Sequence, residues 1–120
     1  MTPSLWRRIS LLALMAIVGV VASGCTSAQP PEVSGDDPEL VEGRELYGAL
    51  CASCHGADGG GGRGLPLNKG RLLVAFPEPE AQIDLVTNGR ASMPGFSGRL
   101  SEAEMVAVVR YTREIIAAVD

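Results

Sequence analysis

The chain has 120 residues, a formal net charge of −4 and only 4% aromatic residues. Its basic residues are too thinly spread to form a phosphate-binding surface, so the composition argues against a nucleic-acid-binding protein. The length indicates one domain once a leader is removed. A domain that small has little apolar core and usually needs a covalent staple or a cofactor.

The first 24 residues have the pattern of an export signal peptide. Arg7 and Arg8 precede an almost wholly apolar run over residues 9–22. That run has 14 residues, whereas a membrane-spanning helix needs about 20. Residues 1–24 are therefore predicted to be removed and to contribute nothing to the mature fold.

The apolar run leads into Val-Ala-Ser-Gly-Cys at residues 21–25, which resembles the lipobox of bacterial lipoproteins. In that family, cleavage precedes the cysteine, whose thiol and new amino group are then acylated. The resemblance implies a lipid anchor at Cys25, on the extracytoplasmic (periplasmic) side of a bacterial membrane. It also accounts for a cysteine that would otherwise be an unpaired thiol in an exported protein. The alternative is ordinary cleavage nearby, for instance after Ala28, which would give a soluble periplasmic or secreted protein.

Residues 25–37 are predicted to be the lipidated cysteine followed by a flexible tether. The segment from Thr26 to Asp37 is rich in Pro, Ser, Gly and acidic residues and has no apolar periodicity. Twelve residues reach at most about 40 Å. Such a tether would let the domain, residues 38–120, face membrane proteins beside it.

A first helix is predicted to begin at Asp37-Pro38, because aspartate caps free backbone N–H groups and proline suits the first helical position. Four residues at spacings of three and four form one stripe along this helix: Leu40, Gly43, Tyr47 and Leu50. The helix leads directly into Cys-Ala-Ser-Cys-His at residues 51–55.

This Cys-x-x-Cys-His motif is the signature of covalent c-type haem attachment. The two-residue spacer lets both sulfurs reach the two vinyl groups on one porphyrin edge, and the only histidine of the chain follows where its imidazole can bind the iron. A structural zinc site needs four Cys or His ligands, and only three are present here. A thioredoxin-like pair belongs to a βαβ pattern, which this sequence lacks, and a plain disulfide leaves the histidine unexplained. We therefore predict one haem c held covalently by Cys51 and Cys54, with His55 as an iron ligand.

The rest of the chain predicts loops and two further helices, and no strand. A glycine-rich loop covers 56–64, and 66–76 is loop with one helical turn. A second helix is predicted from Glu78-Pro79 to Asn88-Gly89, since Asn and Gly tolerate the left-handed conformation that ends a helix. The last helix begins at the capping box Ser101-Glu-Ala-Glu104. The sequence thus predicts an all-α domain.

A single histidine leaves the sixth iron position open. Methionine is the expected partner, because a Met/His pair raises the reduction potential, as in electron carriers. Two methionines lie in the signal segment, and Met105 lies on the apolar stripe of the last helix, where a core role is expected. Met93 lies in a loop that Pro94 stiffens and Gly95 allows to turn. Met93 is therefore the predicted sixth ligand.

In this order the motifs closely resemble class I cytochrome c in its small bacterial form, over residues 38–118. In that family a glycine and an aromatic residue stand eight and four positions before the first haem cysteine, as Gly43 and Tyr47 do here. The glycine lets the C-terminal helix cross closely, and the aromatic ring packs against an aliphatic-x-x-Tyr pair, matched by Val108 and Tyr111.

The resemblance implies the cytochrome c fold, three main helices wrapped around one covalently bound haem, with His55 and Met93 as axial ligands. The family's Gly-Pro-x-Leu after the haem motif supplies a proline carbonyl that accepts a hydrogen bond from the proximal histidine. Here the run is Gly-Leu-Pro-Leu at 64–67. Either Leu65 or Pro66 would therefore supply the carbonyl that orients His55.

The implied function is an electron carrier, not an enzyme: a membrane-tethered monohaem cytochrome c that passes single electrons between respiratory or photosynthetic redox proteins outside the cytoplasmic membrane. One alternative is a haem subunit fixed in a larger oxidase or dehydrogenase. Another is a five-coordinate haem sensor or peroxidase, which requires that Met93 does not bind. The middle of the chain is less acidic than its ends, with five basic residues that would steer a partner at low salt: Arg63, Lys69, Arg71, Arg90 and Arg99. The alternative is a mixed, solvated surface.

Overall fold

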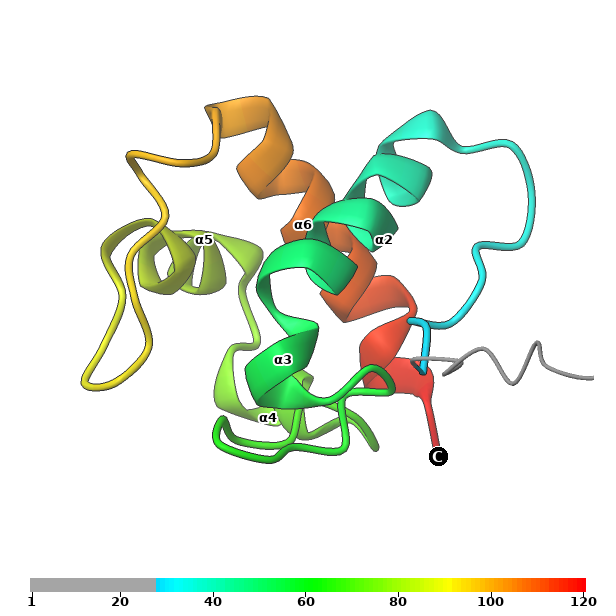
Figure 1. The fold of residues 1–120 in the computed structure, drawn as a ribbon, viewed down its shortest axis with the longest axis horizontal. Helices are drawn as coiled ribbons and strands as arrows, with labels where there is room; N and C mark the ends of the chain where they lie inside the picture. Colours follow the sequence, from blue (N-terminus) through cyan, green and yellow to red (C-terminus); the bar gives the residue numbers. More distant parts are fainter. Residues whose placement is uncertain (1–27) are drawn as a thin grey trace, which may run out of the picture.

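The computed structural model describes residues 28–120, which form a helical domain (Figure 1). The elements follow in the order α2 (Pro38–Leu50), α3 (Ala52–His55), α4 (Arg71–Ala75), α5 (Pro79–Asn88), α6 (Glu102–Glu114) and the 3₁₀ helix η1 (Ile116–Ala118). Within this part of the chain the only β pairing is an isolated bridge between Arg90 and Met93. The all-α prediction with three main helices, α2, α5 and α6, is confirmed. The predicted signal peptide, 1–24, and Cys25 lie outside the described residues.

The crossing of α2 and α6 is the centre of the fold (Figure 1). A Cβ added at Gly43 would collide with the carbonyl of Ala107 and lie 2.8 Å from the Cβ of Tyr111. Only glycine therefore permits this close approach. Beside the crossing, the rings of Tyr47 and Tyr111 are fully buried with their centroids 5.7 Å apart, in the tilted arrangement that aromatic pairs favour.

Local caps explain where the main helices begin. The Asp37 carboxylate accepts hydrogen bonds from the N–H groups of Glu39 and Leu40 at the start of α2. Ser101 and Glu104 form the predicted capping box at the start of α6. Arg110 of α6 also forms an ion pair with Asp37, at 3.0 Å, so one carboxylate both caps α2 and joins it to α6.

Residues 30–33, ahead of α2, contact the rest of the domain. We call these four residues the strap (within the cyan segment in Figure 1). Arg44 donates hydrogen bonds to the carbonyls of Pro30 and Pro31 and pairs with Glu32. The side chain of Val33 packs against the core. The predicted tether, 25–37, thus includes four residues that contact the domain. Composition suggested flexibility because it does not reveal a hydrogen-bond donor that comes from a later helix.

Side chains of α6 and the end of the chain hold the remaining segments. Gln82 of α5 donates a buried hydrogen bond of 2.8 Å to Thr112, and Arg113 donates to the carbonyl of Phe76 ahead of α5. The backbone N–H groups of Lys69 and Gly70 donate to the carbonyls of residues 119 and 117. No helix among residues 28–120 is long and apolar enough to cross a membrane.

Candidate functional site

The haem motif occupies a single turn of helix directly after α2. The N–H of Cys51 bonds to the carbonyl of Tyr47 at 2.9 Å, and the N–H groups of Cys54 and His55 both bond to the carbonyl of Cys51 at 3.0 Å. Both cysteines are free thiols and partly buried. The turn therefore presents two thiols and one imidazole within five residues, as covalent haem attachment requires.

The thiol of Cys51 is uncharged near neutral pH. Burial is the main cause and the neighbouring Cys54 adds to it, and together they raise the pKa of Cys51 to about 11. The Cys51 side chain is therefore a neutral thiol in the free protein. No group of three or more His, Cys, Asp or Glu residues in the described part of the chain is arranged to hold a metal ion.

His55 is oriented by a backbone carbonyl. Its Nδ1 lies 2.8 Å from the carbonyl oxygen of Leu65, so Nδ1 carries the proton and donates. The lone pair of Nε2 is then free for a metal, the usual arrangement of a metal-binding histidine. Of the two candidates from the sequence, Leu65 is the residue that orients the imidazole.

Gly64 is a site residue that the sequence did not single out. A Cβ at this position would lie 2.7 Å from Cε1 of the His55 ring, so only glycine leaves room for the imidazole. Its N–H donates to the carbonyl of Cys54 at 2.8 Å and closes the loop onto the haem motif. The sequence feature that could have identified Gly64 is its position next to Leu65, in the Gly-Leu-Pro-Leu segment at 64–67.

The loop that carries Met93 is pinned at several points. Arg90 and Met93 exchange two backbone hydrogen bonds, of 3.0 and 2.9 Å. Gly89 has a positive φ of 75° and approaches the chain so closely that an added Cβ would lie 2.5 Å from the Met93 carbonyl oxygen. The N–H of Phe96 then donates to the carbonyl of Val86 in α5. The loop is therefore a fixed support for the thioether rather than a mobile one.

Met105 has the core role that its place on the helix stripe predicted. Its side chain is 5% exposed, and its sulfur accepts a hydrogen bond of 3.2 Å from the hydroxyl of Thr87. Met93 is only partly buried and comes from a different segment than His55, after α5 rather than after α2 (Figure 1). Among the methionines of residues 28–120, Met93 is thus the one whose sulfur has no such partner.

These groups fit a c-type haem. The donor set consists of two thiols, an imidazole with a free Nε2 and a thioether on a fixed loop. Partly buried apolar side chains from α2, the following loop and α5 also pack against the core, and they suit a porphyrin face: Leu50, Leu67 and Ile83.

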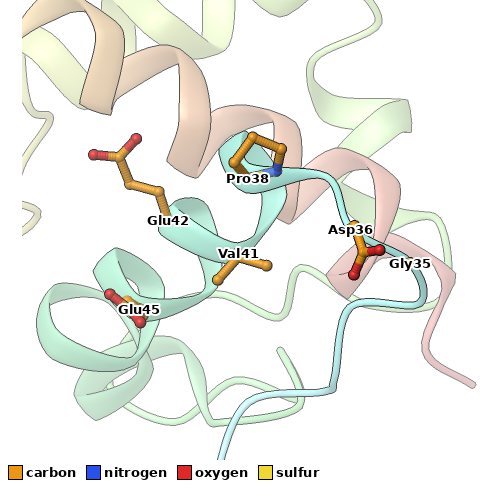
Figure 2. Close-up of a pocket in the computed structure, with 6 residues that line it drawn as sticks. All are labelled: Gly35, Asp36, Pro38, Val41, Glu42 and Glu45. Atoms are coloured by element: carbon orange, nitrogen blue, oxygen red, sulfur yellow. The ribbon is translucent and has the colours of Figure 1, made fainter.

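A shallow pocket on the outer side of α2 has different chemistry (Figure 2). Its lining contains three carboxylates and no His or Cys: Gly35, Asp36, Pro38, Val41, Glu42 and Glu45. Glu42 and Glu45 project from the helix in Figure 2. Together they make this side of α2 acidic.

The five basic residues that were predicted to steer a partner carry no salt bridge within residues 28–120, whereas Arg44 and Arg110 both do. Arg99 instead lies over the ring of Phe96, 5.4 Å from its centroid. Arg90 shares two backbone hydrogen bonds with Met93. Four of the five cations thus lie in loops, and Arg71 begins α4 and donates to the side chain of Asn68. The outer face of α2, in contrast, is acidic.

Comparison with known proteins gives a family match. Residues 38–111 match the family described as cytochrome C oxidase, cbb3-type, subunit III. A cytochrome c6 of Leptolyngbya boryana is 38% identical over 75 residues, which are 61% of this chain and 88% of that protein. The cbb3-type cytochrome c oxidase subunit FixP of Azorhizobium caulinodans is 33% identical over 85 residues, which are 68% of this chain but only 29% of that protein.

Solved structures agree in fold. Cytochrome c6 from the diatom Phaeodactylum tricornutum is similar with a TM-score of 0.55 and 32% identity, over 67% of this chain and 93% of that one. The dihydro-heme d1 dehydrogenase NirN is similar with a TM-score of 0.56 and 34% identity, over 60% of this chain. The similar region is 16% of the NirN chain.

Proposed function

This chain belongs to the small class I c-type cytochromes, and on that premise we propose that it is a membrane-tethered protein that passes single electrons between redox proteins outside the cytoplasmic membrane. Membership of the family makes covalently bound haem c its cofactor and electron transfer its role. When bound, the haem supplies a one-electron change at its iron. The protein's own residues hold, orient and enclose that group.

The observation that carries the proposal is the bond between His55 and Leu65. The Leu65 carbonyl fixes the proton on Nδ1 and the orientation of the ring, which leaves Nε2 as the only nitrogen able to bind iron. The two thiols one and four positions earlier would form the thioether bonds. The two thiols and the imidazole, all in one helical turn, would thereby hold the haem and supply one of its iron ligands.

We assign the sixth ligand to Met93. Two backbone hydrogen bonds between Arg90 and Met93 fix the turn that carries the Met93 thioether. A Met/His pair gives the high reduction potential typical of electron carriers. Filling the sixth position also leaves no open site for a substrate, so the five-coordinate sensor or peroxidase alternative is disfavoured.

The test is a redox titration of the purified holoprotein, followed by absorption spectra. The ferric protein is expected to have the far-red methionine-to-iron band. Met93→Ala should lose that band, lower the reduction potential and bind cyanide, while the covalent haem stays attached. The matched control is Met105→Leu, which should keep the band because Met105 is a core residue. A high-spin wild-type spectrum, or a band that survives in Met93→Ala, would exclude this ligation.

We propose lipidation at Cys25 as the means of attachment, on the basis of its lipobox-like sequence. Cys25→Ser should move the protein from the membrane fraction to the soluble fraction of cells. Continued membrane retention of that variant would exclude an anchor at Cys25 and would leave attachment through another protein.

The second candidate is a haem subunit fixed in a larger oxidase. The likeness to FixP favours it, although the matched region is 29% of FixP. Purification from solubilised membranes separates the two functions. A carrier leaves its partner at moderate salt, because charge pairs at exposed surfaces are screened, whereas a fixed subunit stays with its complex.

A further inference from the structure

The strap, residues 30–33, joins the haem domain to the proposed anchor. We propose that it binds the domain so close to Cys25 that the haem stays at the membrane surface, and that the electron partner is a redox protein embedded in or seated on that same membrane. This inference rests on the proposed lipid anchor and names the class of partner that the anchor permits.

Arg44 of α2 is the main attachment point. Its Nε donates to the carbonyl oxygens of Pro30 and Pro31, at 3.1 and 3.0 Å. Its Nη2 pairs with the Glu32 carboxylate at 2.6 Å. The Glu32 side chain is 82% exposed, so that ion pair adds little. The hydrogen bonds from the charged guanidinium to two carbonyls are the stronger part, because a charged donor strengthens a hydrogen bond.

Tyr111 of α6 provides a second attachment. Its hydroxyl donates to the carbonyl of Pro31 at 2.6 Å, and its ring is fully buried against Tyr47. The ring of Pro30 lies over Gly48 of α2, where even an added Cβ would make only an ordinary contact at 3.4 Å. The strap therefore touches both helices of the central crossing.

The sequence of the strap suits this binding. Two consecutive prolines have fixed φ angles, so the chain loses less freedom when it is held. Prolines also lack an N–H, and the strap offers its carbonyls to donors on the helices. Val33 then adds an apolar contact with the core before the chain turns into α2.

Holding the strap shortens the tether. Four residues, 26–29, remain between Cys25 and Pro30, and four residues reach at most about 14 Å, whereas twelve would reach about 40 Å. Over the shorter distance the domain stays beside the bilayer surface. A redox protein held at the same surface is therefore the partner that this geometry favours, because the two proteins meet without either leaving the membrane.

The first experiment tests the strap with the full-length, lipidated holoprotein in detergent micelles. A glutamyl endopeptidase is added, and the fragment that begins at Val33 is quantified by mass spectrometry. The double variant Arg44→Ala/Tyr111→Phe, which removes the strap's donors, should be cut after Glu32 at least about tenfold faster, because cleavage follows the population of the released strap. Arg44→Ala alone serves if the double variant folds poorly.

Arg63→Ala is the matched control, since it removes an exposed arginine that does not contact the strap. It should be cut at the wild-type rate. Equal rates in the wild type and in the strap variants would overturn the bound strap, whatever the fate of the anchor.

The second experiment tests the distance to the membrane. The same proteins are bound to phosphatidylcholine vesicles that contain a fluorescent, headgroup-labelled phosphatidylethanolamine, and quenching of that label by the haem is measured. The wild type should quench most strongly, and the strap variants less. A positive control, an eight-residue Gly-Ser insertion between Ala28 and Gln29, should also weaken quenching with the strap intact.

The outcomes separate the two proposals. Wild-type protein that does not bind vesicles would refute the lipid anchor, while the cleavage experiment would still report on the strap. Vesicle binding with equal quenching in wild type and strap variants would refute the role of the strap in holding the haem at the membrane.

Discussion

The hydroxyl of Tyr47 donates a hydrogen bond of 2.6 Å to the carbonyl of Gly56, the residue that follows His55. This bond joins the last turn of α2 to the end of the turn that carries both thiols and the imidazole. The same ring packs against Tyr111 of α6. The helix crossing and the haem motif are thereby one connected unit.

Tyr47→Phe should keep the aromatic packing and lose this hydrogen bond. The carbonyl of Gly56 would then lack its partner, so we expect the free energy of unfolding to fall by about 1 kcal/mol. Guanidinium unfolding of the holoprotein, followed by circular dichroism, measures the change. Haem content should be unaltered, and a stability equal to wild type would mean that the bond contributes nothing in solution.

Gly95→Ala should disturb the ligand loop. An added Cβ would lie 2.8 Å from the carbonyl oxygens of Thr87 and Asn88, so the loop must move away from α5, at a cost of roughly 1–3 kcal/mol. We expect a weaker far-red methionine band and a lower reduction potential. Gly98→Ala is the control, because nothing lies within 4 Å of its added Cβ. An unchanged band in Gly95→Ala would contradict a tightly pinned loop.

Gly43→Ala should separate the two crossing helices. The new methyl group would meet the backbone of Ala107 in α6, which cannot yield as a flexible side chain would, so we expect a loss of about 3 kcal/mol or more. Gly48→Ala, in the same helix, is the control: its neighbour is 3.4 Å away. Since alanine favours a helix over glycine by about 1 kcal/mol, this control should be neutral or stabilising by thermal unfolding.

Low pH should weaken the ion pair between Asp37, which caps α2, and Arg110 of α6. The hydrogen bond from Arg110 is the largest cause that lowers the pKa of Asp37 below its ordinary value of 3.8, and the N–H of Leu40 adds to it. A lowered folded-state pKa gives stability that is complete above the unfolded value and is lost as the pH falls through the folded value. The unfolding free energy should therefore fall with pH from about pH 5 downward.

Asp37→Asn should make that acid dependence shallower, because asparagine still caps the helix but does not titrate. The change in slope is compared with that of Asp36→Asn, which removes a neighbouring carboxylate that forms no ion pair with Arg110. The slope is obtained from urea unfolding at a series of pH values. A slope in Asp37→Asn identical to that of the wild type would show that this carboxylate does not contribute to the loss of stability at low pH.

Much of the fold followed from local signals. Capping motifs predicted where the main helices begin or end, because caps act within one turn. These motifs are Asp37-Pro38, Asn88-Gly89 and Ser101 with Glu104. The haem motif and the choice between Met93 and Met105 also depended on spacing and on helix stripes, which are readable along the chain.

Long-range contacts were not readable in this way. The strap is Pro-Pro-Glu-Val, and its hydrogen-bond donors, Arg44 and Tyr111, lie 13 and 80 residues away from Pro31. Whether Leu65 or Pro66 faces His55 depends on the path of a glycine-rich loop, in which several φ angles are accessible to each residue. The helical turn predicted within 66–76 is α4, but its bounds could not be predicted because it has no side-chain cap.

The hydrogen bonds from Lys69 and Gly70 to the carbonyls of Val119 and Ala117 impose an order of events on biogenesis. The segment that follows Leu65 is held by residues that come much later in the chain and are synthesised after it. This support is therefore completed only once that later part of the chain has been made, so the haem motif is available to its cofactor before its surroundings are fully folded.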